Sequence, residues 1–222
     1  MDITWYGHSC FRLSERGAAT VITDPYGEGI GLPVPKLKGD IVTISHQGLG
    51  HSAVEIVKGA QMVLQSPGEY EIGGVFVTGI AMHTIDESRG LARYNVAYSF
   101  DFGGEVNVLH LGDLAHVPDQ RQIQELGEVT VLLVPVGGGN GLRAAMAAEV
   151  IALIEPSYII PMHYALDGLT LDLEPVERFL KAMGVSKVQE EDTLRVSSAP
   201  EEGTQIVLLR PQIKANAENA RG

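Results

Sequence analysis

Short apolar runs, separated by polar or glycine-rich segments, divide the chain into elements of strand and helix length. Residues 41–44 are β-branched and residues 129–136 are apolar except for Thr130, as is typical of buried strands. Further strands are predicted at residues 3–13, 18–22, 62–65, 75–82, 95–100, 105–111, 158–161, 193–196 and 204–209. Helices are predicted at residues 53–59, 119–126, 142–154 and 173–183. Because helices follow strands in the second half, we expect a layered α/β fold with two sheets inside and helices outside.

The segments between these runs carry turn and capping signals. A polar turn at residues 14–17 predicts a hairpin between the first two strands, and glycine and proline predict a loop at 27–38 and a turn at 66–71. Ser52 and Glu55 have the spacing of a capping box for the helix at 53–59. We expect one domain over residues 1–212 and a flexible tail at 213–222.

The composition is that of an ordinary globular protein, with 45% hydrophobic and 20% charged residues among 222. No apolar run reaches the roughly 18 residues that a membrane span needs, and the first residues lack the features of a signal peptide. We therefore expect a cytoplasmic protein without a membrane partner. The single cysteine, Cys10, excludes an internal disulfide and a thiolate cluster, so any metal must be bound by histidine and carboxylate.

The net charge of −12 argues against a nucleic-acid partner, because such binding needs a basic surface and the Lys and Arg residues are scattered. A small anionic substrate remains compatible with this charge, since a bound metal ion can dominate the field in its site. We expect a small-molecule substrate. The composition is also compatible with a homo-oligomer.

Three predicted strands run directly into potential metal ligands. The strand at 41–44 leads to His46, the strand at 105–111 leads to Asp113, and the strand at 158–161 leads to His163. If these strands end at a shared edge, imidazole and carboxylate groups converge there. A catalytic zinc needs about three protein ligands and an open position for water, so the pattern predicts a metal site.

Other candidate residues have two interpretations. His8 is either a half-buried strand histidine or part of the site, and Asp24 either begins a turn before Pro25 or belongs to the site. His51 either begins the helix at 53–59 or is a ligand. His110 and His116 are expected to be structural. The glycines at 137–141 form either an anion cradle before a helix or a plain loop.

Several motifs occur in an order that resembles the metallo-β-lactamase superfamily. They are Gly7-His8-Ser9-Cys10-Phe11, Thr23-Asp24-Pro25-Tyr26, Pro67-Gly68-Glu69-Tyr70-Glu71-Ile72, Leu111-Gly112-Asp113, Pro135-Val136-Gly137-Gly138 and Ile160-Pro161-Met162-His163-Tyr164. Together they cover roughly residues 1–209. Within the superfamily the chain is most similar to the small single-domain metal-dependent hydrolases, the branch that includes ascorbate-phosphate lactonase-like proteins.

The loop from His46 to His51 resembles the His-x-His-x-Asp-His loop of this superfamily. In this register the inner histidine is replaced by Gly48 and the aspartate by Gly50. The resemblance implies an αββα sandwich that hydrolyses its substrate with a metal-bound hydroxide.

The resemblance also implies a ligand set for two metals. The first metal would take His46, the residue at position 48 and a histidine near His83, which stands one residue out of register. The second would take the residue at position 50, His51 and His163, and Asp113 would bridge both. Each metal therefore loses one ligand to a glycine, and the second keeps three.

From these losses we expect one zinc ion rather than two, with manganese, iron or no ion as alternatives. Asp24 is the motif carboxylate that could substitute for the missing loop aspartate, and His8 is the second catalytic candidate. We expect a hydrolase of a small ester, lactone or phosphate-bearing metabolite with a reduced site. The alternative is a degenerate, non-catalytic member that binds a ligand or partner. A nuclease is disfavoured by the acidic charge.

Overall fold

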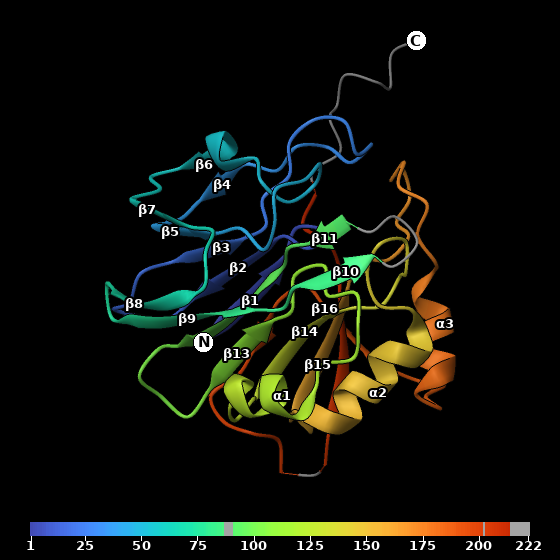
Figure 1. Ribbon diagram of the computed structural model, residues 1–222. Helices are drawn as coiled ribbons and strands as arrows, with labels where there is room; N and C mark the ends of the chain where they lie inside the picture. The colour runs from blue at the N-terminus through green and yellow to red at the C-terminus, as the bar shows by residue number, and fades with distance from the viewer. Residues whose placement is uncertain (87–90, 202, 214–222) are drawn as a thin grey trace.

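The computed structural model describes residues 1–86, 91–201 and 203–213. Two large β-sheets form its centre, and Figure 1 shows helices α1, α2 and α3 on the side of the eight-stranded sheet that faces away from the other sheet. Residues 214–222 of the tail predicted at 213–222 lie outside the described residues. Ile213, the first residue of the predicted tail, packs against a hydrophobic cluster. No helix in the described part is long and apolar enough to cross a membrane.

The two large sheets contain six and eight strands. The six-stranded sheet has the order β17 (Leu194–Arg195), β1 (Asp2–Trp5), β2 (Phe11–Ser14), β3 (Val21–Thr23), β5 (Ile41–Thr43) and β7 (Met62–Leu64). The eight-stranded sheet has the order β16 (Gln189–Glu191), β18 (Gln205–Leu209), β15 (Tyr158–Met162), β14 (Val131–Pro135), β13 (Asn107–His110), β12 (Val96–Asp101), β9 (Val75–Ala81) and β8 (Gly68–Ile72).

Smaller elements surround these sheets. Two short ladders pair β4 (Leu37–Lys38) with β6 (Val57–Lys58) and β10 (Thr84–Asp86) with β11 (Leu91–Arg93). The α-helices are α1 (Gln120–Leu126), α2 (Ala144–Ile154) and α3 (Val176–Ala182), and a 3-10 turn, η1, covers Val54–Ile56. Helix α1 matches its prediction, and Asp119 and Gln122 form a capping box at its start.

Alternating side chains of the six-stranded sheet supply two separate hydrophobic clusters. Val21 and Ile41 belong to the main core, whereas the next residues, Ile22 and Val42, belong to a second cluster. Because successive strand residues point to opposite faces, the main core lies on one face of this sheet and the second cluster on the other. Residues of the loop predicted at 27–38 cover that second face, together with a 3-10 turn rather than an α-helix.

The prediction of one strand at residues 3–13 was wrong. β1 and β2 form an antiparallel hairpin that pairs Ile3 with Leu13 and Trp5 with Phe11. The turn between them contains Gly7 at φ 94° and His8 at φ 51°, backbone conformations that end a strand. The residues on both sides of the turn are apolar and buried, so hydrophobicity alone did not reveal it.

Two further local predictions were wrong. Residues 53–59 form η1 and β6 instead of an α-helix, and the Ser52 hydroxyl donates to the Gly48 carbonyl rather than capping a helix. The predicted turn at 66–71 is largely strand β8, which pairs with β9 across Gly68–Ile72. Pairing with a neighbouring strand supplies the hydrogen bonds that local sequence signals could not indicate.

Candidate metal centre

The candidate site lies where several strands end. β3 and β5 are parallel neighbours in one sheet, and β13, β14 and β15 are parallel neighbours in the other, so the carboxyl ends within each group meet at one edge. Loops that follow these strands, and the turn before β2, carry the candidate side chains. These side chains are His8, Asp24, His46, His51, Asp113 and His163.

Backbone conformation sets three of these residues apart. In the described part of the chain the non-glycine residues with positive φ are Glu155 and three site residues, His8 (51°), Asp24 (38°) and His163 (54°). Such conformations cost energy and persist only where surrounding contacts hold them. The carbonyl oxygen of His8 accepts hydrogen bonds from the Trp5 indole (3.0 Å) and from the His163 amide (3.1 Å). This contact ties the turn before β2 to the end of β15.

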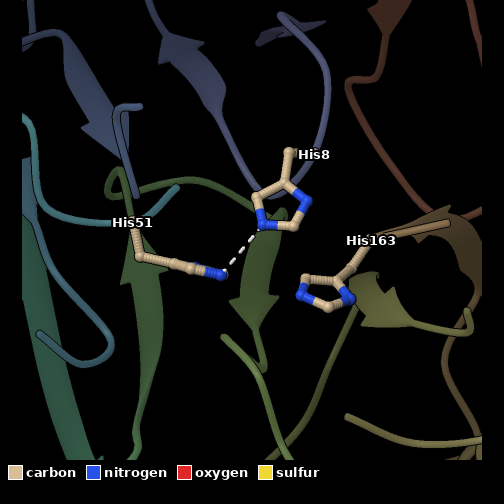
Figure 2. Close-up of side chains that lie close together, drawn as sticks. All are labelled: His8, His51 and His163. Carbon is tan, nitrogen blue, oxygen red and sulfur yellow. Dashed lines mark hydrogen bonds between the residues drawn. The ribbon is translucent and has the colours of Figure 1, made fainter. Parts of the chain in front are cut away.

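Two groups of potential ligands lie at this edge. His8, His51 and His163 form one group, and His46, His51 and Asp113 form the other. Within each group the potential ligand atoms all lie within 4.8 Å of one another. Figure 2 shows the three rings of the first group approaching one another from separate elements, with His8 Nε2 3.1 Å from His51 Nε2. The two groups share His51.

Asp24 lies behind His51 and belongs to neither group. One of its carboxylate oxygens accepts from the Ser45 amide at 2.7 Å, and the other accepts from the Ser45 hydroxyl at 2.6 Å. That second oxygen also lies 3.3 Å from Nδ1 of His51. When Asp24 is ionised, its carboxylate favours the His51 tautomer with hydrogen on Nδ1, which leaves Nε2 of His51 as an acceptor facing His8. Asp24 is therefore placed to orient His51, and it is not among the potential ligands of either group.

Asp113 joins the site to a positive charge. Its Oδ2 accepts from the Arg93 guanidinium at 2.8 Å, and its Oδ1 lies 3.5 Å from Nε2 of His163. Arg93 also donates to the Asn140 carbonyl. Burial raises the pKa of Asp113 to about 6, although Arg93 and His46 partly oppose this shift. Asp113 therefore carries most of its negative charge only above that pH.

Burial keeps the imidazoles of the cluster neutral near pH 7. Desolvation lowers the pKa of His46 and lowers those of His8 and His51 well below the ordinary value. The same cause lowers the pKa of His163 to about 4. Burial acts oppositely on Asp24, whose pKa rises to about 8 against the hydrogen bonds from Ser45. Neutral imidazoles have the free lone pair that a metal ligand requires.

The structure leaves three histidines outside both groups. The His83 side chain is exposed, and its Nδ1 accepts from the Asn95 amide at 3.2 Å, so the residue predicted for the first metal is not brought into the cluster. His110 is buried at the end of β13, where Nε2 faces the Ser9 carbonyl at 2.9 Å and Nδ1 accepts from Gly112. His116 faces Gln122. His110 and His116 have the structural places expected of them.

Because His110 is buried, we expect the fold to lose stability in acid. Its pKa falls from the ordinary 6.5 to about 4, mainly through burial, so between these values the unfolded chain binds a proton that the folded chain does not. The stability contribution is therefore complete above pH 6.5 and is lost as the pH falls toward 4. It amounts to about 3 kcal/mol. Urea unfolding of the metal-free protein at pH 7 and pH 5 measures this effect. The free energy of unfolding should fall less between these pH values in His110→Gln than in the wild type, and an equal fall in both would contradict the prediction.

The structure adds three residues that the sequence did not single out. Ser45 holds Asp24, Arg93 pairs with Asp113, and the Asn95 side chain accepts from the Asp113 amide while donating to the Leu111 carbonyl. A polar residue between the strand at 41–44 and His46 was a usable signal for Ser45. Arg93 lies in a stretch without regular hydrophobic spacing, so only its position in space reveals its partner.

A family model, the beta-lactamase superfamily domain, matches residues 2–163. A crystal structure of a Thermotoga maritima protein, provisionally described as a Zn-dependent hydrolase of the metallo-beta-lactamase superfamily, has a TM-score of 0.75 and 36% identity. The match covers 94% of this chain and 98% of that chain. This likeness confirms the predicted fold class and the predicted superfamily.

Curated relatives agree with this match. A UPF0173 metal-dependent hydrolase of Methanopyrus kandleri is 28% identical over 83% of this chain and 94% of its own length. Another of Thermoplasma volcanium is 27% identical over 86% of this chain and 97% of its own length. Their descriptions bear out the predicted small metal-dependent hydrolase branch. By the family match, the fold and the edge site together, the chain belongs to the beta-lactamase superfamily.

Proposed function

We propose that this chain is a metal-dependent hydrolase that binds one divalent cation, zinc by preference, and acts on a small ester, a lactone or a phosphate-bearing metabolite. The observation that carries the proposal is the pair of ligand groups that share His51, each with its ligand atoms within 4.8 Å. The relatives described as metal-dependent hydrolases support the reaction class.

The donor set fits such a cation. Asp113 Oδ1 is buried and has no hydrogen-bond partner among the described residues. A buried carboxylate oxygen without a partner is costly, and a cation beside it would remove that cost. Neutral imidazole nitrogen and carboxylate oxygen are ligands that zinc accepts, and manganese and iron bind the same donors.

His51 supports one ion rather than two. Both ligand groups need this residue, and its Nδ1 already faces Asp24 at 3.3 Å. Only Nε2 remains to bind a cation, and one lone pair serves one ion. Gly48 and Gly50 supply no further side-chain ligand in this loop.

The chain's own residues prepare the site in three ways. Asp24 in its ionised form, oriented by Ser45, favours the His51 tautomer that leaves Nε2 free. Arg93, whose side chain is partly exposed, favours a negatively charged group beside Asp113. A cation bound here would lower the pKa of a water molecule and polarise a carbonyl or phosphoryl oxygen of the substrate.

The second candidate is a non-catalytic member of the fold that binds a ligand or partner. The two glycines in the His46–His51 loop favour it, because each removes a side chain that could ligate a metal. A protein of this kind would keep the cluster of histidines and Asp113 but would not turn over a substrate, even with a cation present.

Metal analysis followed by a substrate screen separates the two candidates. The protein is purified without chelator, zinc, manganese and iron are counted per chain, and esters, lactones and phosphodiesters are tested before and after chelation. We expect about one zinc per chain and hydrolysis that chelation abolishes and zinc restores. Failure to bind metal after zinc soaking would overturn the proposal, and a zinc-loaded protein inactive on all three classes would favour the second candidate.

Asp24→Asn should weaken zinc binding by about 10- to 100-fold, as is typical when an outer partner of a ligand histidine is lost. The amide can donate to Nδ1 of His51, which favours the tautomer with hydrogen on Nε2 and removes the free lone pair. Competition with a chromogenic chelator measures the change in affinity. The matched control is Asp40→Asn, because Asp40 accepts from the Thr20 amide and belongs to neither ligand group. Equal affinities in the two variants would contradict the positioning role of Asp24.

A further inference from the structure

The His8 ring is held firmly at the centre of the cluster. Its backbone has positive φ, and its carbonyl accepts from both Trp5 and His163. The centroid of its ring lies 4.6 Å from that of His51 and 4.3 Å from that of His163. Figure 2 shows the His8 ring between the other two. His8 is buried, so its position depends on these contacts rather than on solvent.

The distance between two ring nitrogens suits a shared ion. Nε2 of His8 lies 3.1 Å from Nε2 of His51. Two nitrogens bound to one tetrahedral zinc at about 2.0–2.1 Å are separated by about 3.3 Å. His163 completes a group of three imidazoles with a potential ligand atom within 4.8 Å of the other two.

Gly50 provides the space that the His8 ring occupies. A Cβ atom at Gly50 would lie 3.0 Å from both Cδ2 and Nε2 of His8, closer than side-chain contacts normally allow. Position 50 is where the loop could otherwise carry a ligand side chain. The Nε2 edge of His8 thus lies where that side chain would begin.

We propose that His8 is a metal ligand of this chain and forms, with His51 and His163, a three-imidazole site in place of the ligand missing at Gly50. This inference rests on the proposed function and specifies which of the two groups binds the cation. Three neutral ligands leave more of the cation's charge for its remaining ligand than a set containing a carboxylate does. Asp24 and Asp113 then act beside the site as neighbouring carboxylates.

X-ray absorption at the zinc edge tests this proposal, because it counts imidazole ligands directly. Zinc-loaded wild-type protein and the variants His8→Gln and His46→Gln are compared, and chelator competition gives the zinc affinity. We expect three imidazoles in the wild type, two in His8→Gln and three in His46→Gln. Affinity should fall by roughly 100-fold or more in His8→Gln, beyond the usual effect of an outer partner.

Three outcomes would overturn the inference. They are two imidazoles with a carboxylate in the wild type, an unchanged ligand count and affinity in His8→Gln, or two imidazoles in His46→Gln. Each of these leaves the proposed function standing, because zinc is still bound. A wild-type chain that binds no zinc would instead remove both proposals. If His8→Gln does not fold, as judged by thermal unfolding of the metal-free protein, the ligand counts of the wild type and His46→Gln still test the inference.

Discussion

Replacing His51 by alanine is expected to abolish zinc binding, whichever group of ligands holds the ion. His51 belongs to both groups, and the residue is also the partner that Asp24 orients. Because a bound cation supplies several kcal/mol of transition-state stabilisation, hydrolysis should fall by about 1000-fold or more. Elemental analysis and turnover of the most active substrate class measure both effects.

His116→Ala is the matched control for this experiment. His116 lies outside both groups, and its ring faces Gln122. The control should retain zinc at the wild-type stoichiometry. If His51→Ala also retained one tightly bound zinc, the cation would have to lie elsewhere, and the proposed centre would be wrong.

Gly137→Ala should destabilise the fold and disturb the site together. A Cβ atom at this position would lie 2.3 Å from the His163 carbonyl oxygen and 2.6 Å from Cα of Tyr164. Both are backbone atoms and cannot rotate away, so the loop that carries His163 would have to move. We expect a loss of about 1–3 kcal/mol in the free energy of unfolding, typical of overpacking, and weaker zinc binding. Urea unfolding and chelator competition measure the two effects.

Gly104→Ala is the control, because a Cβ atom there would meet no atom within 4 Å. Equal stability and equal zinc affinity in the two variants would show that residue 137 does not constrain His163. The close approach of the two loops also explains why residue 137 is glycine. The Gly137 amide donates to the His163 carbonyl at 3.0 Å, which leaves no room for a side chain there. Of the two interpretations of this glycine run, these contacts favour the loop over the anion cradle.

The strands that lead to the candidate site were predictable from local pattern. β5, β13 and β15 are mostly buried, and each is followed within a few residues by His46, Asp113 or His163. The prediction that these strands end at a shared edge depends on parallel pairing. Such pairing is present between β3 and β5 in one sheet and among β13, β14 and β15 in the other. The hydrophobic pattern and the residue types were therefore enough to predict that His46, Asp113 and His163 follow buried strands.

The turn that places His8 was not predictable in the same way. The stretch from Ile3 to Leu13 is largely apolar, and the structure buries residues on both sides of the turn. Gly7 was the one local signal of a break, and glycine within a strand pattern often marks a bulge or a close approach instead. His83 lies outside both ligand groups for a related reason, since position along a strand does not determine which way the following loop turns.

By itself, the sequence determined the family, the main strands and the kinds of ligand available to a cation. Composition restricts those ligands to imidazole and carboxylate, because the only cysteine is buried and alone. Only the tertiary structure decided which histidines face one another. His8 and His51 are 43 residues apart in the chain and 3.1 Å apart in space. Such a contact depends on strand pairing and turn conformation together, and on the room that Gly50 leaves for the His8 ring.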